Sequence, residues 1–242
     1  MISCAVLLAA GRGQRLGRGA PKCLVPVRGR TLLERHLHSL AACGVPRAAL
    51  VVGFRRDLVE AHLARVPSPI PVELVDNDRF DRGNILSLHV AADRLDTGGL
   101  WMDTDVLYPT ALLRRLLTSP HEDCLLLDPR ASETGEEMMA GVRGGRVARI
   151  ARRIGPGWDL AGEAVGFTRV SAEGARVLRR YLDEEVAEGR VDAVYEAALD
   201  RALAELRFGY ERVDDLPWTE IDFEEDLDRA EQIAAEIDPS GG

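Results

Sequence analysis

Short apolar runs and longer amphipathic segments alternate through the first half of the chain. Apolar runs typical of buried strands recur at residues 5–8, 48–52, 72–75, 100–102 and 124–127. Segments suited to helices separate them, at residues 33–40, 57–64, 84–94 and from Pro109 onward. This alternation predicts an α/β fold with a mixed, mostly parallel sheet flanked by helices on both faces, in a Rossmann-like arrangement.

The second half has a different pattern. Residues 136–142 and 146–154 flank Gly144-Gly145, which predicts a small β-hairpin. The remaining segments predict strands at 164–170 and 208–213 and helices at 171–186, 192–206 and 224–237. Because no linker or repeat divides the chain, we expect a single domain over residues 1–242, with halves at 1–130 and 131–242.

Charge and cysteine content narrow the class of protein. The 242 residues carry a net charge of −9, with 40 acidic against 31 basic side chains, which argues against a general nucleic-acid or membrane binder. The cysteines at 4, 23, 43 and 124 lack metal-site spacing and suit a reducing compartment. With neither a signal peptide nor a membrane-length apolar stretch in view, we expect a cytoplasmic protein.

A glycine-rich segment, LAAGRGQRLGRGAPK, directly follows the first apolar run and covers Leu8 to Lys22. Its glycines let the backbone approach a ligand closely, and its cations are Arg12, Arg15, Arg18 and Lys22. Such a loop is typical of a phosphate cradle. A dinucleotide fingerprint fits less well, because its third glycine would fall at Leu16, and a plain structural turn remains the alternative.

Two groups of carboxylates are candidates for a metal site. Asp103 and Asp105 end an apolar strand, where open parallel sheets bind ligands, and could hold Mg²⁺ or form a solvated turn. Farther along, Trp218, Glu220 and Asp222 would share one face of an extended segment. Asp222 would then either help to bind a metal or cap the helix that follows.

Together these motifs resemble those of nucleotidyltransferases with a GT-A-like fold. The order LAAGxGxR…PK, Asp103-x-Asp105, Glu163-x-x-Gly166-Phe167 and the WxEIDxxxDL pattern from Trp218 is similar to that of cytidylyltransferases acting on phosphocholine and related phospho- or phosphono-compounds. The stretch from Asn77 to Leu88 also resembles a segment of that family. The resemblance covers nearly the whole chain and implies a nucleotide-binding half and an acceptor-binding half.

The resemblance also implies roles for individual residues. The nucleotide would be wrapped by Leu8, Ala9, Ala10, Gly11, Arg12 and Gly13, with Asn84, Ser87 and Asp103 nearby. The catalytic residues would be Arg15, Lys22 and Asp105, and the Mg²⁺ ligands would be Asp105, Glu220 and Asp222. The acceptor would meet Arg130, Arg152, Trp158, Glu163 and Trp218.

The acceptor side departs from the family pattern at one point. Many relatives carry a lysine on the hairpin, whereas this chain has Met138-Met139-Ala140-Gly141-Val142. Either Arg130, Arg152 or Arg153 supplies the missing charge, or these arginines are simply solvated. The basic cluster Arg146, Arg149, Arg152 and Arg153 favours an anionic acceptor, such as a carboxylate-bearing phosphonate, over a quaternary ammonium. Trp158 lies in a loop rich in glycine and proline, and this loop could act as a lid.

The expected activity is therefore Mg²⁺-dependent transfer of CMP from CTP to a small anionic phospho- or phosphono-acceptor, with release of pyrophosphate. Such an acceptor is largely dianionic near neutral pH, so no general base is needed. Two alternatives remain: a sugar- or inositol-phosphate nucleotidyltransferase that uses another NTP, and a nucleotide-binding regulator without catalysis. A homodimer is left open, and no nucleic-acid or membrane partner is expected.

Overall fold

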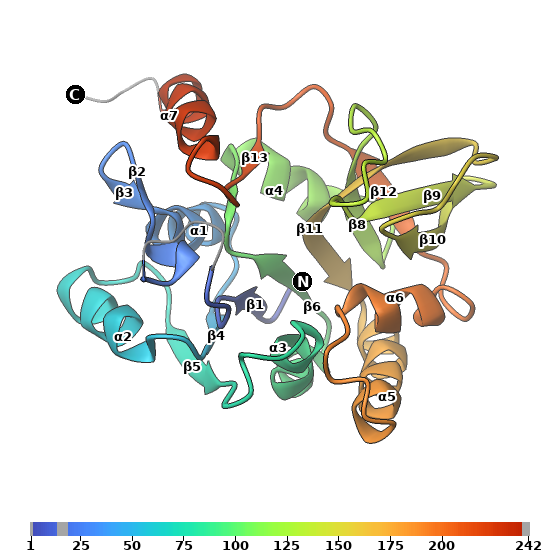
Figure 1. The fold of residues 1–242 in the computed structure, drawn as a ribbon, viewed down its shortest axis with the longest axis horizontal. Coiled ribbons are helices and arrows are strands. Elements are labelled where there is room, and N and C mark those ends of the chain that lie inside the picture. Colours follow the sequence, from blue (N-terminus) through green and yellow to red (C-terminus); the bar gives the residue numbers. More distant parts are fainter. Residues whose placement is uncertain (1, 14–18, 239–242) are drawn as a thin grey trace.

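The computed structural model describes residues 2–13 and 19–238, and its centre is a nine-stranded sheet (Figure 1). Its parallel part runs in the order β6 (Gly99–Asp103), β1 (Ala5–Leu8), β4 (Ala48–Val52) and β5 (Val72–Asp76). Leu8 pairs with Val51 on one side and with Asp103 on the other. The strands therefore end together, and the loops that follow them meet along one edge of the sheet.

The other half of the sheet is mainly antiparallel. The long strand β11 (Leu160–Val170) joins it to β6 and also pairs with β8 (Cys124–Asp128) and β9 (Met139–Arg143). Strand β10 (Arg146–Ala151) completes a hairpin with β9, and β12 (Gly209–Arg212) runs parallel to β8. The predicted mixed sheet with a small β-hairpin is thus confirmed.

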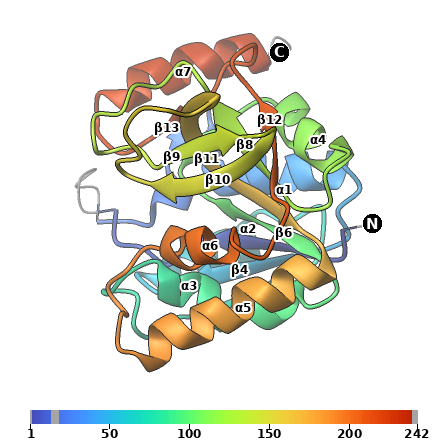
Figure 2. The same ribbon diagram turned by 90° about the vertical axis from the view of Figure 1, so that its right-hand side faces the viewer.

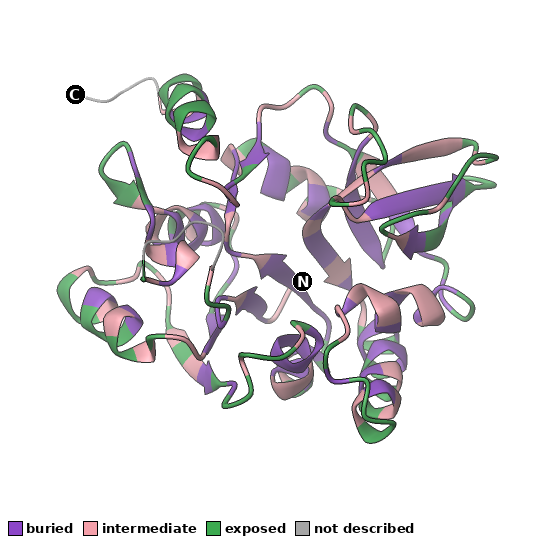
Figure 3. Cartoon of the chain, viewed as in Figure 1, coloured by how far each residue is buried: buried purple, intermediate pink, exposed green. Residues whose placement is uncertain are grey.

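Helices cover both faces of the sheet (Figure 2). One face packs against α1 (Leu32–Ala42), α2 (Arg56–Arg65) and α4 (Thr110–Thr118). The other packs against α3 (Ile85–Val90), α5 (Ala172–Ala187) and α6 (Glu196–Ala202). Leu7 and Val6 of β1 belong to these two separate cores, as alternation along a strand requires. Figure 3 shows the sheet buried between the inward sides of the helices.

A third, smaller core anchors the end of the chain. Helix α7 (Asp226–Ile237) packs on short strand pairs, β2 (Pro26–Val27) with β3 (Arg30–Thr31) and β7 (Val106–Leu107) with β13 (Thr219–Glu220). In the second pair Glu220 lies opposite Val106, and the Ile221 amide donates to the Asp105 carbonyl over 2.9 Å. This ladder brings residues near 220 against the end of β6.

Several predicted boundaries were wrong. The segment 84–94 is not one helix but α3 followed by a 3₁₀ helix, Ala92–Leu95. The helix expected from Asp192 begins only at Glu196, because the amides of Gly83 and Ile85 bind the carbonyls of Val191 and Ala193 and hold that segment irregular. The last helix begins at Asp226 rather than at 224. The two-residue strands were not predicted, since so short a run carries no periodic signal.

Among the helices that the structure describes, none has the length and apolar character needed to cross a bilayer.

A buried histidine makes the stability of this fold depend on pH. His36 on α1 is fully buried, its Nδ1 lies 3.2 Å from the Tyr108 hydroxyl, and burial lowers its pKa to about 4. The unfolded chain takes up this proton near pH 6.5 and the folded protein does not. The contribution of His36 to stability is therefore complete above pH 6.5 and falls by on the order of 3 kcal/mol as the pH drops toward 4.

We expect His36→Gln to flatten this part of the pH dependence. Urea unfolding of both proteins at several pH values between 7.5 and 4.5 gives the free energy of unfolding, and its slope against pH should be smaller for the variant. Parallel curves for the two proteins would show that His36 does not contribute.

Candidate functional site

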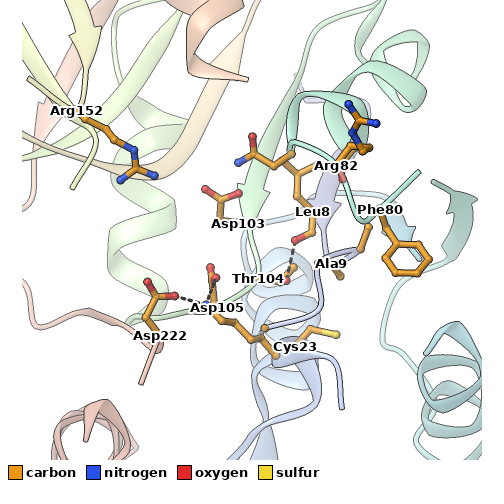
Figure 4. A pocket seen from close by; sticks show the side chains of 16 residues that line it. Leu8, Ala9, Cys23, Phe80, Arg82, Asp103, Thr104, Asp105, Arg152 and Asp222 are labelled. Carbon is orange, nitrogen blue, oxygen red and sulfur yellow. Dashed lines mark hydrogen bonds and ion pairs between the residues drawn. The ribbon is translucent and has the colours of Figure 1, made fainter. Parts of the chain in front are cut away.

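Three neighbouring cavities lie where the parallel strands end. The first has a volume of about 430 Å³ and is lined by the loop after β1, by the end of β6 and by residues near α3 (Figure 4). The second and third, of about 510 and 180 Å³, lie toward the hairpin and α7. Asp222 lines the first and second cavities, and Asp105 lines the first and third, so these carboxylates stand where the cavities meet.

The glycine-rich loop forms one wall of the first cavity. Two backbone hydrogen bonds hold the loop against β4 and the turn after it. The Ala9 amide donates to the Val51 carbonyl over 3.0 Å, and the Phe54 amide donates to the Ala10 carbonyl over 3.0 Å. Gly13 has a φ of +55°, and a Cβ there would lie 2.7 Å from Lys22 Cγ. The loop therefore rests directly on the stem of Lys22, which only glycine permits.

Of the two arginines predicted to act from this loop, the structure describes Arg12 but not Arg15. Arg12 is exposed and stacks over the rings of Phe54 and Phe80, at 5.9 and 5.4 Å from their centroids. Arg15 lies in segment 14–18, outside the described residues, so its catalytic role stays a prediction.

Lys22 is the basic group at the centre of the site. It opens a 3₁₀ helix, Lys22–Leu24, and its Nζ donates to Asp105 Oδ2 over 3.1 Å and to Asp222. Burial lowers the pKa of Lys22, but the Asp105 and Asp222 carboxylates outweigh burial and raise it above its usual value. The ammonium therefore stays charged near neutral pH.

Asp105, Glu220 and Asp222 form a group with the chemistry of a metal site. One oxygen from each lies within 4.8 Å of the others, as the pairing of β7 with β13 requires. Glu220 is exposed, yet desolvation by the surrounding protein and then the carboxylates of Asp105 and Asp222 raise its pKa to about 9. These crowded acidic groups, with their hard oxygen donors, suit a divalent cation such as Mg²⁺. Asp222 is not the N-cap residue of α7, because the helix begins at Asp226 with Glu225 in the N-cap position, and the Asp222 amide donates to Asp226 Oδ2 over 2.8 Å.

Asp103 is held behind this group. Tyr195, itself buried, donates from its hydroxyl to Asp103 Oδ2 over 2.8 Å. Burial, then the charges of Asp105 and Glu196, raise the pKa of Asp103 well above its usual value. Gly166 approaches from β11 with a φ of +76°, and a Cβ there would lie 2.4 Å from Asp103 Oδ2. The predicted Glu-x-x-Gly motif thus makes room for Asp103.

Asn84 and Ser87 line the first cavity, as expected for residues near the nucleotide. The Tyr195 amide donates to Asn84 Oδ1 over 2.9 Å, and Asn77 Nδ2 donates to Ser87 Oγ over 3.0 Å. Both side chains are therefore held by fixed partners. Their predicted contact with cytidine stays a prediction.

The predicted acceptor residues come together only in part. Glu163 and Trp218 line the second and third cavities, and Arg130 lines the second. Trp218 Nε1 donates to Asp128 Oδ2 over 2.7 Å, and Arg130 binds the same carboxylate through its guanidinium. Burial, then the charge of Glu137, raises the pKa of Glu163 to about 7.

The basic cluster does not form a common anion site. Arg149 pairs with Asp200, and Arg153 donates to the Thr134 carbonyl. Of the four, only Arg152 lines any of the three cavities, namely the first and the third. Figure 4 shows its guanidinium across the first cavity from Phe80. The cluster therefore gives no support to a carboxylate-bearing acceptor, which stays a prediction, because Arg149 and Arg153 have separate partners.

Trp158 lies apart from the three cavities. Its ring packs over Gly141 of β9, with the Arg143 guanidinium 4.6 Å from the ring centroid, and its Nε1 donates to the Ile154 carbonyl. These contacts fasten the loop to the hairpin. A contact between Trp158 and the acceptor stays a prediction.

Sequence reasoning missed several residues that line the cavities, and three of them bear on the site. Phe80 and Arg82 line the first cavity and Glu196 lines the third. Phe80 belongs to the Asn77-to-Leu88 resemblance, which is a usable signal. Glu196 carries no signal in the chain, because its position depends on where α6 begins.

Comparisons with known proteins place these features in a wider group. Residues 5–156 match the family described as the MobA-like NTP transferase domain. A bifunctional IPC transferase and DIPP synthase of Thermococcus kodakarensis is 29% identical over 95% of this chain, which spans 50% of that protein. A 2-aminoethylphosphonate cytidylyltransferase of Lancefieldella rimae is 25% identical, and the match covers 90% of this chain and 87% of that protein. The inositol-1-phosphate CTP transferase of T. maritima has a similar fold, with a TM-score of 0.80 at 22% identity, covering 100% of this chain and 98% of its own.

The close approach of Gly166 to Asp103 generates a prediction for stability. Gly166→Ala adds a methyl group against the Asp103 carboxylate, whereas Gly189→Ala, at a φ of +80° with open space around it, adds only backbone strain. We expect Gly166→Ala to be less stable than the control variant by about 1–3 kcal/mol, as for overpacking. Thermal unfolding of both variants measures this, and equal losses would contradict the proposed contact.

Proposed function

Because the chain belongs to the family of MobA-like NTP transferase domains, we propose that it transfers CMP from CTP to a small phosphomonoester or phosphonate and releases pyrophosphate. An acceptor oxygen attacks the α-phosphorus, and the bond to the oxygen bridging the α- and β-phosphorus breaks. That oxygen leaves with the pyrophosphate. The reaction balances without a redox partner or a covalent enzyme intermediate.

One observation carries the proposal. The Lys22 ammonium and the Asp105–Glu220–Asp222 group lie at the junction of the glycine-rich nucleotide cavity with the two cavities beyond it. This is where two anionic substrates would have to meet. The chief obstacle to reaction between them is mutual repulsion, so the chemistry needs positive charge at this point, which Lys22 supplies and a divalent cation on the three acidic residues would increase.

Each charged residue then has a distinct task. Lys22 stabilises the charge that develops on the leaving pyrophosphate. Asp105 and Asp222, with Glu220, would hold Mg²⁺, which neutralises phosphate oxygens and orients the displacement when bound. Asn84 and Ser87 hold the nucleoside end, and Arg152, reaching in from the hairpin, contacts the acceptor phosphonate.

A second candidate keeps the chemistry but changes the acceptor. A bifunctional IPC transferase matches 95% of this chain, and the fold is similar to that of an inositol-1-phosphate CTP transferase. These relatives support inositol 1-phosphate as an alternative acceptor. A panel containing 2-aminoethylphosphonate, phosphocholine and inositol 1-phosphate, each tested with all four NTPs, separates these possibilities.

The proposal predicts the effect of removing single charges. We expect Asp105→Asn and Lys22→Met each to lower kcat by on the order of 10²–10³-fold, because each removes a charge from the transition-state site. Chelation of Mg²⁺ should abolish turnover. Pyrophosphate release, with ³¹P NMR of the product, measures all three effects.

Asp183→Asn is the matched control, because Asp183 is an exposed residue of α5 paired with His89. It should leave turnover unchanged. If CTP binds but no acceptor in the panel gives pyrophosphate, the chain is a nucleotide-binding protein and the proposal fails.

A further inference from the structure

The segment that carries two of the three acidic residues has little regular structure of its own. Strand β13 contains only Thr219 and Glu220, and Asp222 follows it outside any helix or strand. The Ile221 amide donates to the Asp105 carbonyl, which fastens the segment to the turn after β6. So short a ladder is only marginally stable by itself. The direction of the Asp222 side chain therefore depends on what holds the backbone at residues 222 and 223.

Asp226, in the first turn of α7, holds this backbone. Its Oδ2 accepts hydrogen bonds from the amides of Asp222 and Phe223, each over 2.8 Å. The Asp226 amide in turn donates to the Phe223 carbonyl over 3.2 Å, so these two residues are bound in both directions. Hydrogen bonds from amides to a carboxylate are charge-assisted and stronger than those between neutral groups. The Asp226 carboxylate therefore closes the turn that leads from Asp222 into α7.

The support on which Asp226 stands is itself fixed. The buried face of α7 packs in the third core together with Ile221, which directly precedes Asp222. The core thus holds the chain just before Asp222, and Asp226 holds the backbone at Asp222 and just after it. This arrangement keeps the Asp222 carboxylate on the Lys22 ammonium and close to Asp105.

Asp226 does not belong to the acidic group whose position it sets. Among the described residues, the oxygens that lie within 4.8 Å of one another come from Asp105, Glu220 and Asp222. The Oδ2 of Asp226 is directed at the two backbone amides instead. Partners that orient a metal ligand without touching the ion still affect affinity, because a ligand held in place loses less conformational freedom when the ion binds.

We propose that Asp226 is a positioning residue, which fixes the Asp222 carboxylate for binding of a divalent cation during CMP transfer. This inference rests on the proposed function and on the metal-binding role that it gives to Asp105, Glu220 and Asp222. Its consequence is that loss of the Asp226 carboxylate weakens metal binding although all three acidic residues of the group are still present.

The test compares two substitutions of Asp226. Asp226→Ala removes the acceptor oxygen, whereas Asp226→Asn keeps an oxygen that can accept from both amides and removes only the charge. With a non-hydrolysable CTP analogue present, we expect Asp226→Ala to weaken Mn²⁺ binding by on the order of 10- to 100-fold, the usual effect of losing such a partner. Asp226→Asn should keep most of the wild-type affinity. Electron paramagnetic resonance of free Mn²⁺ measures these affinities without turnover.

Asp228→Ala is the matched control, because Asp228 is an exposed acidic residue in the same first turn of α7. It removes an equal charge from the same helix end and should leave Mn²⁺ affinity unchanged. Alanine is a strong helix former, so α7 should persist in both alanine variants. If Asp226→Ala does not fold, Asp226→Glu takes its place. It keeps the charge but displaces the oxygen by one methylene, and it should weaken Mn²⁺ binding as well.

A double-mutant cycle shows whether Asp226 acts through Asp222. In an Asp222→Asn background, removal of the Asp226 carboxylate should have little further effect on the Mg²⁺ concentration that gives half-maximal turnover. Additive effects of the two substitutions would overturn the inference. So would wild-type Mn²⁺ affinity in Asp226→Ala, or an equal loss in Asp226→Asn and Asp226→Ala.

Failure of this inference is distinguishable from failure of the proposed function. Each of those three results leaves CMP transfer intact, because pyrophosphate release by the wild-type protein tests the transfer separately. A wild-type protein that binds no Mn²⁺ in the presence of the CTP analogue would contradict the metal site itself, and this inference with it.

Discussion

The contact of the Lys22 ammonium with Asp105 and Asp222 holds the site together. The three residues lie far apart in the chain, separated by 83 and 200 positions from Lys22. Each comes from a different part of the fold: Lys22 from the 3₁₀ helix after the glycine-rich loop, Asp105 from the turn between β6 and β7, and Asp222 from the segment after β13. One partly buried cation therefore joins three distant parts of the sequence, and its side chain also packs against Gly13.

The mixed sheet explains why the cavities differ in charge. Its parallel part ends in backbone amides and the glycine-rich loop, which suit phosphate groups. Its antiparallel part and α6 present carboxylates such as Glu163 and Glu196. Lys22 and the acidic group stand on the boundary between the two. Under the proposed function, the nucleotide and the small acceptor would meet at that boundary.

The sequence predicted this site unevenly, for physical reasons. Asp103, Asp105, Lys22 and Asp222 are adjacent to strand ends or short motifs, so local pattern was enough to find them. Glu196 was missed because its place depends on hydrogen bonds between segments 83–85 and 191–195, which no local spacing encodes. Arg149 was misjudged because a run of arginines on a strand does not reveal that Asp200 lies opposite.

The most direct test of the account is a crystal structure with CTP and Mn²⁺, using anomalous scattering at the manganese edge. The account predicts a single strong peak bound by the Asp105 and Asp222 carboxylates, with Lys22 Nζ moved onto a phosphate oxygen of the nucleotide. A peak bound elsewhere, or a nucleotide bound while Lys22 still bridges both carboxylates, would contradict it.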